Sequence, residues 1–426
     1  MSAAGPPQGT GPLGGAARSD ARGEHTSQNA SRGRARLAPL LRPGITLVLL
    51  CALAGCATIY EYLPVPPAFS LRWLWSSKKP GPLPELKPSA TANANWQVAV
   101  GKAVPGFAPT VSADAIYVAA ADGGITRIDP ATGRTVWRIS ANRTLSAGVG
   151  ADANVVVVGT DKGDVLAFDT NGSPKWTTKV STEVIAPPRV AEGIVAIFAG
   201  DGSIHALSAA DGSKKWVNQR VAPSLTVRNF AGGALARGAL FAGTAGGRLL
   251  AFDIATGIVG WDATVANPKG ATELERIADV TSLPLVDQRQ VCAVAYQGRL
   301  ACFDITRGTL NWSRDLSSLY GLATDGKNIY VTDDKGAVQA LDRANGASVW
   351  KQDLLAARKI GVPQIVGDLV GVIDVEGYLH LLSAANGAYV GRLATDGTAA
   401  TAQPVPFLGS VLWQSAGGTL YAVTAK

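Results

Sequence analysis

Few residues of this 426-residue sequence have types and spacings that suggest chemistry. Two of its three histidines, His205 and His380, stand at the same position of two similar segments. Five similar segments carry an aspartate just before a turn, where a side-chain oxygen commonly caps the turn; these are Asp129, Asp169, Asp253, Asp304 and Asp342. The sequence contains no Gly-x-Ser-x-Gly elbow, no Walker loop and no cluster of Cys and His ligands. It therefore predicts no hydrolytic or nucleotide-binding centre and no metal site.

Cys56 is the residue at which covalent chemistry is expected. An apolar run over residues 45–53, too short to span a membrane, follows a set of basic residues: Arg32, Arg34, Arg36 and Arg42. The run ends in Leu53-Ala54-Gly55-Cys56, where small side chains let a peptidase reach the bond before the cysteine. This pattern resembles the lipobox of bacterial lipoproteins, which implies that residues 1–55 are a signal peptide and that Cys56 carries a diacylglycerol. An ordinary signal peptide that happens to carry a cysteine is the alternative.

The next segment, residues 56–94, is predicted to be an extended tether. Its prolines exclude a helix or an interior strand; they are Pro64, Pro66, Pro67, Pro80, Pro82, Pro84 and Pro88. Part of the net charge of +7 lies in the expected signal peptide. Residues 1–55 contain six arginines and two acidic residues, a balance of +4, which leaves +3 for the rest of the chain. Such a small surplus gives no reason to expect nucleic acid as a partner.

From residue 95 onward the sequence repeats a unit of about 40 residues. Each unit has a β-rich run, a turn with glycine, a strand of the form Leu-x-Ala-Phe-Asp, a second turn and a strand with tryptophan. The tryptophans are separated by steps of 41, 39, 40, 45, 51 and 38 residues, and they are Trp96, Trp137, Trp176, Trp216, Trp261, Trp312 and Trp350. A step near 40 residues fits one four-stranded propeller blade.

The two ends of the repeat predict how the ring closes. The next step lands on Gly391, in a unit that keeps the rest of the pattern, and the last unit stops at Lys426 before any tryptophan strand. The strand expected over residues 95–100 supplies what the last unit lacks, and joining the two removes both free sheet edges. The sequence thus predicts an all-β fold over residues 95–426, an eight-bladed β-propeller of four-stranded antiparallel blades closed by pairing of the N- and C-terminal strands. Seven blades are the alternative.

The repeat resembles that of the pyrroloquinoline quinone (PQQ) propellers, in which the tryptophan packs between neighbouring blades. A PQQ-dependent periplasmic dehydrogenase is therefore the alternative function. Such an enzyme needs a Ca²⁺ site of several oxygens and an Asp base, and the family's enzymes are much longer and commonly carry a vicinal Cys pair that this sequence lacks. His205 and His380 are expected four blades apart, at surface or inter-blade polar positions. No catalytic residue and no cofactor is expected.

Cys292 and Cys302 flank an apparent two-residue turn at Gln297-Gly298. A turn of this length pairs Cys292 with Phe303, which places the two thiols on opposite faces of the sheet. An oxidising compartment would permit a disulfide. The register nevertheless favours two free, buried thiols.

Two segments resemble the BamB family, the propeller lipoproteins of the outer-membrane β-barrel assembly (BAM) machinery. They are Pro223-Ser224-Leu225-Thr226-Val227-Arg228 and Thr272-Glu273-Leu274-Glu275-Arg276-Ile277-Ala278-Asp279-Val280. The resemblance implies a non-enzymatic scaffold that binds the periplasmic POTRA domains of BamA, the central barrel subunit, and assists insertion of outer-membrane proteins. It places the partner contacts at Leu225, Val227, Arg228 and Asp279, with Glu273 and Arg276 nearby. The family carries a second acidic residue two positions after Asp279, where this chain has Thr281.

The spacing of the repeat supports these two segments independently. The long steps of 45 and 51 residues are consecutive, and the extra residues fall between the last strand of one unit and the first strand of the next. Such connections all lie at one end of a propeller, so the two insertions are expected to form one patch. Leu225 and Val227 alternate as on a strand, with Arg228 beside them, which suits a protein interface. Inert surface insertions are the alternative.

These features predict a protein held on the periplasmic face of the outer membrane by a lipid on Cys56. By resemblance to other lipoproteins, an Asp after the lipidated cysteine favours the inner membrane, and this chain has Ala57 there. The expected partners are the BamA POTRA domains and the BAM complex. Whether nascent outer-membrane proteins also bind is left open by the sequence.

Overall fold

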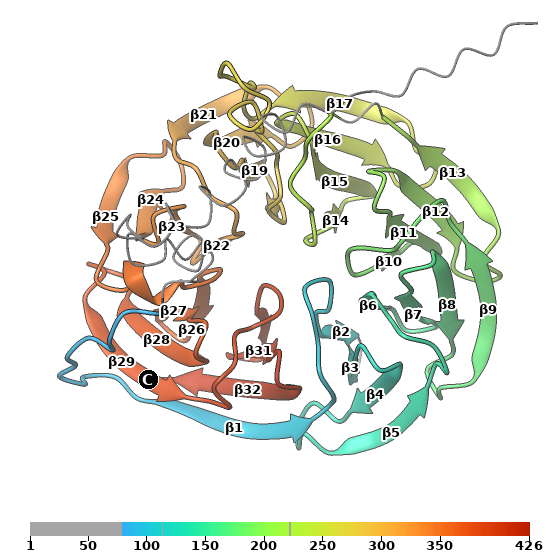
Figure 1. The fold of residues 1–426 in the computed structure, drawn as a ribbon, viewed down its shortest axis with the longest axis horizontal. Coiled ribbons are helices and arrows are strands. Elements are labelled where there is room, and N and C mark those ends of the chain that lie inside the picture. Colours follow the sequence, from blue (N-terminus) through green and yellow to red (C-terminus); the bar gives the residue numbers. More distant parts are fainter. Residues whose placement is uncertain (1–78, 113, 221–222) are drawn as a thin grey trace, which may run out of the picture. The chain divides into compact units, whose positions relative to one another are not determined.

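The computed structural model describes residues 79–112, 114–220 and 223–426, and these form eight four-stranded antiparallel sheets. The sheets stand around a central axis as the blades of a propeller, with the first strand of each blade next to the axis and the fourth at the rim (Figure 1). The predicted eight-bladed propeller is confirmed, and seven blades are excluded. Cys56 and residues 56–78 of the expected tether lie outside the described residues.

Blades 1 to 4 follow one another along the chain. Blade 1 contains β2 (Thr110–Ser112), β3 (Ala115–Ala119), β4 (Gly124–Ile128) and β5 (Thr135–Ser140); blade 2 contains β6 (Ala147–Ala151), β7 (Val156–Gly159), β8 (Asp164–Phe168) and β9 (Pro174–Lys179). Blade 3 contains β10 (Arg189–Ala191), β11 (Ile194–Phe198), β12 (Ile204–Ser208) and β13 (Lys214–Asn218); blade 4 contains β14 (Gly233–Ala236), β15 (Ala239–Thr244), β16 (Arg248–Asp253) and β17 (Val259–Thr264).

Blades 5 to 8 complete the ring. Blade 5 contains β18 (Leu285–Val286), β19 (Gln290–Val294), β20 (Arg299–Asp304) and β21 (Leu310–Asp315); blade 6 contains β22 (Leu322–Thr324), β23 (Asn328–Thr332), β24 (Val338–Asp342) and β25 (Ser348–Gln352). A 3-10 turn, η1 (Ala356–Arg358), leads to blade 7, which contains β26 (Gln364–Val366), β27 (Leu369–Ile373), β28 (Tyr378–Ser383) and β29 (Tyr389–Ala394). Blade 8 contains β30 (Val405–Phe407), β31 (Ser410–Gln414), β32 (Thr419–Ala425) and β1 (Ala92–Ala99).

The hydrophobic core lies between the blades. Eight apolar clusters are present, and each joins side chains of two neighbouring blades, so that every junction of the ring has its own cluster. Because alternate residues of a strand point to opposite faces, the middle strands of each blade contribute to both adjacent junctions. No helix among the described residues is long and apolar enough to cross a membrane.

The tryptophan of the fourth strand joins one blade to the next. Trp137 Nε1 donates to the Thr170 carbonyl of blade 2 at 3.0 Å, and the same bond recurs from Trp176, Trp216, Trp261, Trp312 and Trp350. Each indole also packs on a glycine in the last turn of the next blade. At Gly257, where φ is +73°, an added Cβ would lie 2.5 Å from the Trp216 ring. The inter-blade packing implied by the resemblance is therefore confirmed.

The two ends of the described chain close blade 8. β1 pairs antiparallel with β32 from Ala92↔Ala425 to Ala99↔Thr419, so the strand begins three residues before the expected one. The two strands are not joined by a turn, and blade 8 therefore has no turn glycine for a tryptophan of blade 7 to pack on. Gly391 stands at that position in blade 7, and an added Cβ there would lie 2.8 Å from the Ala90 carbonyl oxygen. The backbone N–H groups of Ser89 and Ala90 donate to the Val390 carbonyl at 2.9 and 3.0 Å.

A buried ionic network holds the beginning of this segment. Arg358 of η1 donates to the Gly81 carbonyl at 2.5 Å and to Asp374 Oδ2 at 2.6 and 2.9 Å. The same guanidinium donates to Glu376 at 2.5 Å. Arg358 is 3% exposed and Asp374 is fully buried. Residues 81–91 are therefore fixed to the propeller at both ends, by Arg358 and by blade 7.

The histidines and the repeated aspartates have structural partners. His380 Nε2 lies 2.9 Å from Asp374 Oδ2, and His205 Nε2 lies 2.9 Å from Ser203 Oγ. Both histidines are buried four blades apart, so a surface position is wrong for either of them, and polar neighbours permit the burial. Turn capping by the aspartates is confirmed: Asp129 Oδ1 accepts from the Thr132 N–H at 2.8 Å, and the other four make equivalent bonds.

The prediction of free thiols is wrong, because Cys292 and Cys302 form a disulfide. The hairpin between β19 and β20 has a three-residue turn, in which the Ala295 N–H donates to the Arg299 carbonyl at 3.1 Å. The register therefore differs by one residue from the expected one and places Cys292 directly opposite Cys302. Both sulfurs then lie on the same face of the sheet. Their burial is as predicted.

The disulfide predicts a measurable thiol state. Protein purified without reductant and unfolded in guanidinium should show no free thiol at Cys292 or Cys302 when it is alkylated and weighed by mass spectrometry. Replacing both cysteines by alanine should lower the free energy of unfolding by about 2 to 3 kcal/mol, because the bridge closes only a short loop in the unfolded chain. Alkylation of both Cys292 and Cys302 before reduction would contradict the disulfide.

Asp374 predicts a pH dependence of stability. Burial raises the pKa of this carboxyl, but hydrogen bonds from His380, the Tyr378 backbone and Arg358 outweigh burial and leave the pKa below its ordinary value. The unfolded chain therefore takes up a proton first as pH falls. The stabilisation is complete above the ordinary pKa of about 4 and is lost as the pH falls through the lower native value.

Urea unfolding at pH 7, 4 and 3 measures this dependence. Asp374→Asn should cost about 3 kcal/mol at pH 7, because Arg358 loses its buried partner, and the variant should lose less stability on acidification than the wild type. Asp368→Asn, in an exposed turn, is the matched control and should behave as wild type. An equal acid slope for wild type and Asp374→Asn would show that this carboxyl does not set the dependence.

Candidate functional site

The two insertions lie at the same end of the propeller. The first connects β13 to β14 and the second connects β17 to β18, so each runs from the outer strand of one blade to the inner strand of the next. We call the end at which residues 223–232 and 265–284 lie the insertion end. The Arg358 network is at this end as well, because η1 occupies the equivalent connection between β25 and β26.

Asp279 joins the two insertions. Its Oδ2 accepts from the Val227 N–H at 2.6 Å, and its Oδ1 accepts from the Gly246 N–H at 2.8 Å. The backbone of Asp279 also accepts from the Tyr296 N–H at 2.9 Å. The side chain is only 2% exposed, so it holds the loops of blades 4 and 5 in place and does not offer a free carboxylate. The sequence predicted that the two insertions lie together, and the resemblance placed Asp279 among the partner contacts; the structure shows its carboxylate bonded to this chain's own backbone.

Arg228 is oriented by a different acid. Its guanidinium forms an ion pair with Glu183, which lies on the connection from blade 2 to blade 3. The guanidinium also lies 5.6 Å from the centre of the Phe230 ring, a distance that allows a cation–π contact. Arg228 remains exposed, so the first insertion presents its guanidinium at the surface.

The second insertion contains a capped helical turn. Glu275 Oε2 accepts from the Ala271 and Thr272 N–H groups at 2.8 and 3.1 Å, and Thr272 Oγ1 accepts from the Glu275 N–H at 3.3 Å. This reciprocal pattern is a capping box. The bonds from the Thr272 and Ala271 backbone lower the pKa of Glu275 and keep it ionised. Arg276 lies 3.7 Å from Glu273 in an exposed ion pair, so both remain available to a partner.

Apolar side chains at the insertion end are exposed on four consecutive connections, the last of which carries Leu354, 50% exposed, before η1. Leu225 is 44% exposed, Leu274 on the second insertion is 66% exposed, and Leu319 before β22 is 43% exposed. Val227, in contrast, is half-buried. The sequence reasoning singled out Leu225 and missed the other three leucines. The available signal was their position in interblade connections, outside the strands of the repeat.

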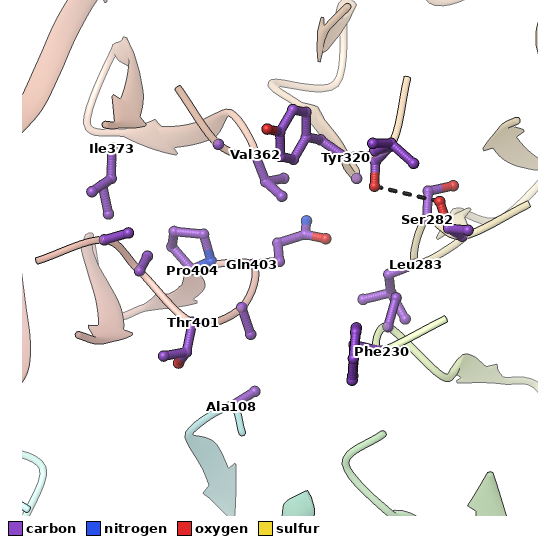
Figure 2. Close-up of a pocket in the computed structure, with 18 of the residues that line it drawn as sticks. Ala108, Phe230, Ser282, Leu283, Tyr320, Val362, Ile373, Thr401, Gln403 and Pro404 are labelled. Atoms are coloured by element: carbon purple, nitrogen blue, oxygen red, sulfur yellow. Dashed lines mark hydrogen bonds between the residues drawn. The ribbon is translucent and has the colours of Figure 1, made fainter. Parts of the chain in front are cut away.

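A cavity of about 650 Å³ opens at the centre of the insertion end. Its wall is built from the connections that lead into the inner strands, and it includes Val227, Phe230 and Thr281 of the two insertions. Figure 2 shows Phe230 and Leu283 on one side of this hollow and Ile373, Pro404 and Thr401 on the other. Thr281 is buried, and its hydroxyl donates to the Leu319 carbonyl at 3.4 Å. The position at which the family pattern has an acid thus carries a neutral group here.

The residues that line the cavity do not fit a Ca²⁺ site. Asp374 is the single carboxylate in the lining, and both its oxygens are engaged by Arg358, His380 and backbone N–H groups. A calcium site needs six to eight oxygen ligands. Within the part of the chain that the structure describes, no three His, Cys, Asp or Glu residues are grouped to hold a metal.

Comparisons with known proteins agree on one family. A sequence model described as "Outer membrane protein assembly factor BamB" matches residues 89–143, 121–352 and 336–426. The chain is 38% identical over 405 residues to the protein of that name from Bordetella pertussis, covering 94% of this chain and all of the relative. It is 42% identical over 359 residues to the one from Nitrosomonas eutropha, covering 82% and 87%.

Solved structures give the same result. The crystal structure of BamB from Moraxella catarrhalis superposes with a TM-score of 0.71 at 26% identity, covering 78% of this chain and all of that one. The quinohemoprotein alcohol dehydrogenase of Comamonas testosteroni superposes with a TM-score of 0.62 at 15% identity, covering 78% of this chain and 76% of the enzyme, which shows a common fold alone. The chain therefore belongs to the BamB family of outer membrane protein assembly factors.

Proposed function

We propose that this protein is a non-enzymatic scaffold of the BAM machinery that binds the POTRA domains of BamA through its insertion end. The observation that carries the proposal is the joining of the two insertions by Asp279. A single buried carboxylate fixes two loops of adjacent blades, and these loops present exposed apolar and charged side chains on a rigid support. Loops held in this way on a rigid scaffold are suited to binding a partner.

The surface has the chemical character of a protein interface. Leu225 and Leu274 provide apolar area, and Arg228 provides a planar guanidinium that can bind a carboxylate or backbone carbonyls. Glu273 and Arg276 supply charge at the edge of this patch. Asp279 acts as a positioning residue, because its contacts are to the backbone of this chain. The fully buried acid contributes to binding through the shape of the loops.

A lipid on Cys56 would hold the protein on the periplasmic face of the outer membrane, and residues 1–55 would be removed as a signal peptide. Residues 56–78 would then connect the lipid to the segment that Arg358 fixes on blade 7.

The lack of a free carboxylate in the cavity supports a binding role over a PQQ-dependent dehydrogenase.

Partner binding should depend on both insertions. Leu225→Ser, Arg228→Ser and Asp279→Ala should each weaken binding of the soluble periplasmic part of BamA by about 1 to 3 kcal/mol, measured by biolayer interferometry. Leu408→Ser and Arg134→Ser replace exposed residues in turns at the opposite end and should leave binding unchanged. Because Asp279 positions the backbone of Val227, Leu225→Ser and Asp279→Ala should be non-additive when combined.

Thermal melting separates loss of the site from loss of the fold. The Leu225 and Arg228 variants should melt as wild type, because both residues lie outside the strands. Asp279→Ala should lower the melting temperature by several degrees, because two partly buried N–H groups lose their acceptor. Unchanged BamA binding in all three variants would remove the insertion end from the proposed function.

Membrane attachment should depend on Cys56. Cys56→Ala should block both lipidation and cleavage before residue 56, which leaves an uncleaved chain detectable by mass spectrometry. The wild type should fractionate with the outer membrane and carry a mass increase from its acyl chains. A Cys56→Ala chain that is still cleaved before residue 56 would contradict the anchor. So would a Cys56→Ala chain that stays in the outer membrane of cells without BamA, where no BamA can retain it.

A further inference from the structure

The central cavity carries chemistry that the surface site does not use. Its walls are largely apolar and include Phe230, Leu283 and Val362 (Figure 2). A volume of about 650 Å³ is within the range of pockets that hold a small molecule or a short peptide segment. The cavity opens at the insertion end, so a segment of a protein bound there can reach it.

An arginine with an unsatisfied donor lines this cavity. Arg189 stands at the start of β10, and its Nη2 donates to the Ala231 carbonyl at 3.3 Å. Its Nε is buried and has no partner, and no carboxylate of the described residues lies within ion-pair distance of its guanidinium. Burial lowers the pKa of Arg189 to about 10, so the group is still positively charged at neutral pH.

The other charges at the cavity do not neutralise Arg189. Arg228 is paired with Glu183, and Asp374 is paired with Arg358 and His380. Lys359, on the blade 7 side, adds a further positive charge. The net charge of the cavity lining is therefore positive, and a partly buried cation without a carboxylate partner is costly. A carboxylate on a bound molecule would satisfy both the charge and the free Nε–H.

An acceptor without a donor faces the same cavity. Gln403 extends from the connection before β30 into the hollow, as Figure 2 shows, and its Nε2 donates to the Leu322 carbonyl at 3.0 Å. Its Oε1 is buried and has no partner among the described residues. A backbone N–H of a bound peptide would satisfy this oxygen. A fatty acid would supply the carboxylate and the apolar chain but no N–H group.

We infer that the central cavity is a second peptide site, which binds a segment with a carboxylate next to an apolar side chain. Arg189 binds the carboxylate, Gln403 Oε1 accepts a backbone N–H, and the apolar side chain packs on Phe230 and Leu283. The carboxylate can come from a chain end or from an acidic side chain. The inference rests on the proposed function as a protein-binding scaffold, and it adds a site with its own ligand chemistry.

Calorimetric titration of the full-length protein in lipid nanodiscs tests this site. The probes are acetyl-Ser-Gly-Leu-Leu with a free C-terminus, the same peptide amidated, and amidated acetyl-Ser-Leu-Asp-Leu. At least one carboxylate peptide should bind saturably and at least tenfold more tightly than the amidated neutral peptide. The free terminus and the internal Asp identify which source of carboxylate is preferred.

The variants assign the binding to named groups. Arg189→Met should weaken the carboxylate peptide at least tenfold and leave the neutral peptide unchanged, Arg189→Lys should restore part of the affinity, and Gln403→Leu should weaken both peptides. Arg134→Met, at the opposite end, is the matched control for charge. Equal binding of acidic and neutral peptides, no saturable binding, or octanoate binding as tightly as the peptide would overturn the inference.

A parallel titration with the soluble periplasmic part of BamA distinguishes BamA binding at the insertion end from peptide binding in the central cavity. Arg189→Met should bind BamA as wild type while it loses the carboxylate peptide, and Leu225→Ser should show the reverse. If Leu225→Ser loses BamA and no peptide binds to any form, the cavity inference fails and the proposed function stands. Melting temperatures within a degree of wild type for both variants show that the propeller is intact.

Discussion

The pairing of β1 with β32 is the constraint on which the rest of the structure depends. It supplies the fourth strand of blade 8, so that neither chain-terminal strand is left unpaired. A junction formed by two chain ends cannot offer the turn glycine on which a tryptophan packs at other junctions, and blade 7 accordingly has Gly391 where its tryptophan would stand. The segment 81–91 occupies that place, and Arg358 fixes its start. The anomalous blade of the sequence is thus a consequence of closure.

A closed ring makes the insertion end a rigid support. Because every junction has its own apolar cluster, loops between blades are held at fixed positions relative to one another. Asp279 then joins the two insertions through the Val227 N–H and fixes them to the β15–β16 turn through the Gly246 N–H. The same closure surrounds the central cavity with inner-strand connections and keeps Arg189 inside it. A surface patch and a charged, mainly apolar cavity therefore share one end of the molecule.

Local signals in the sequence predicted the parts of the fold that repeat. The tryptophan spacing identified eight blades, the composite last blade and the neighbouring insertions, since each follows from counting along one chain. The cysteine register was wrong because a two-residue and a three-residue turn both suit Tyr296-Gln297-Gly298, and one residue changes which face a cysteine occupies. The burial of Asp279 and the contact between Gly81 and Arg358 could not be predicted from local sequence patterns. Gly81 and Arg358 are 277 residues apart, and no local pattern relates them.

Site-specific photocrosslinking in cells tests most directly our proposal that the insertion end faces BamA. A photoreactive phenylalanine analogue would replace Leu225 or Leu274 at this end, or Leu408 in a turn at the other end, where the side chain is 87% exposed. Illumination is predicted to join BamA to the probes at Leu225 and Leu274 and to leave the probe at Leu408 free of BamA. A BamA crosslink at Leu408 with none at the two insertions would contradict the account.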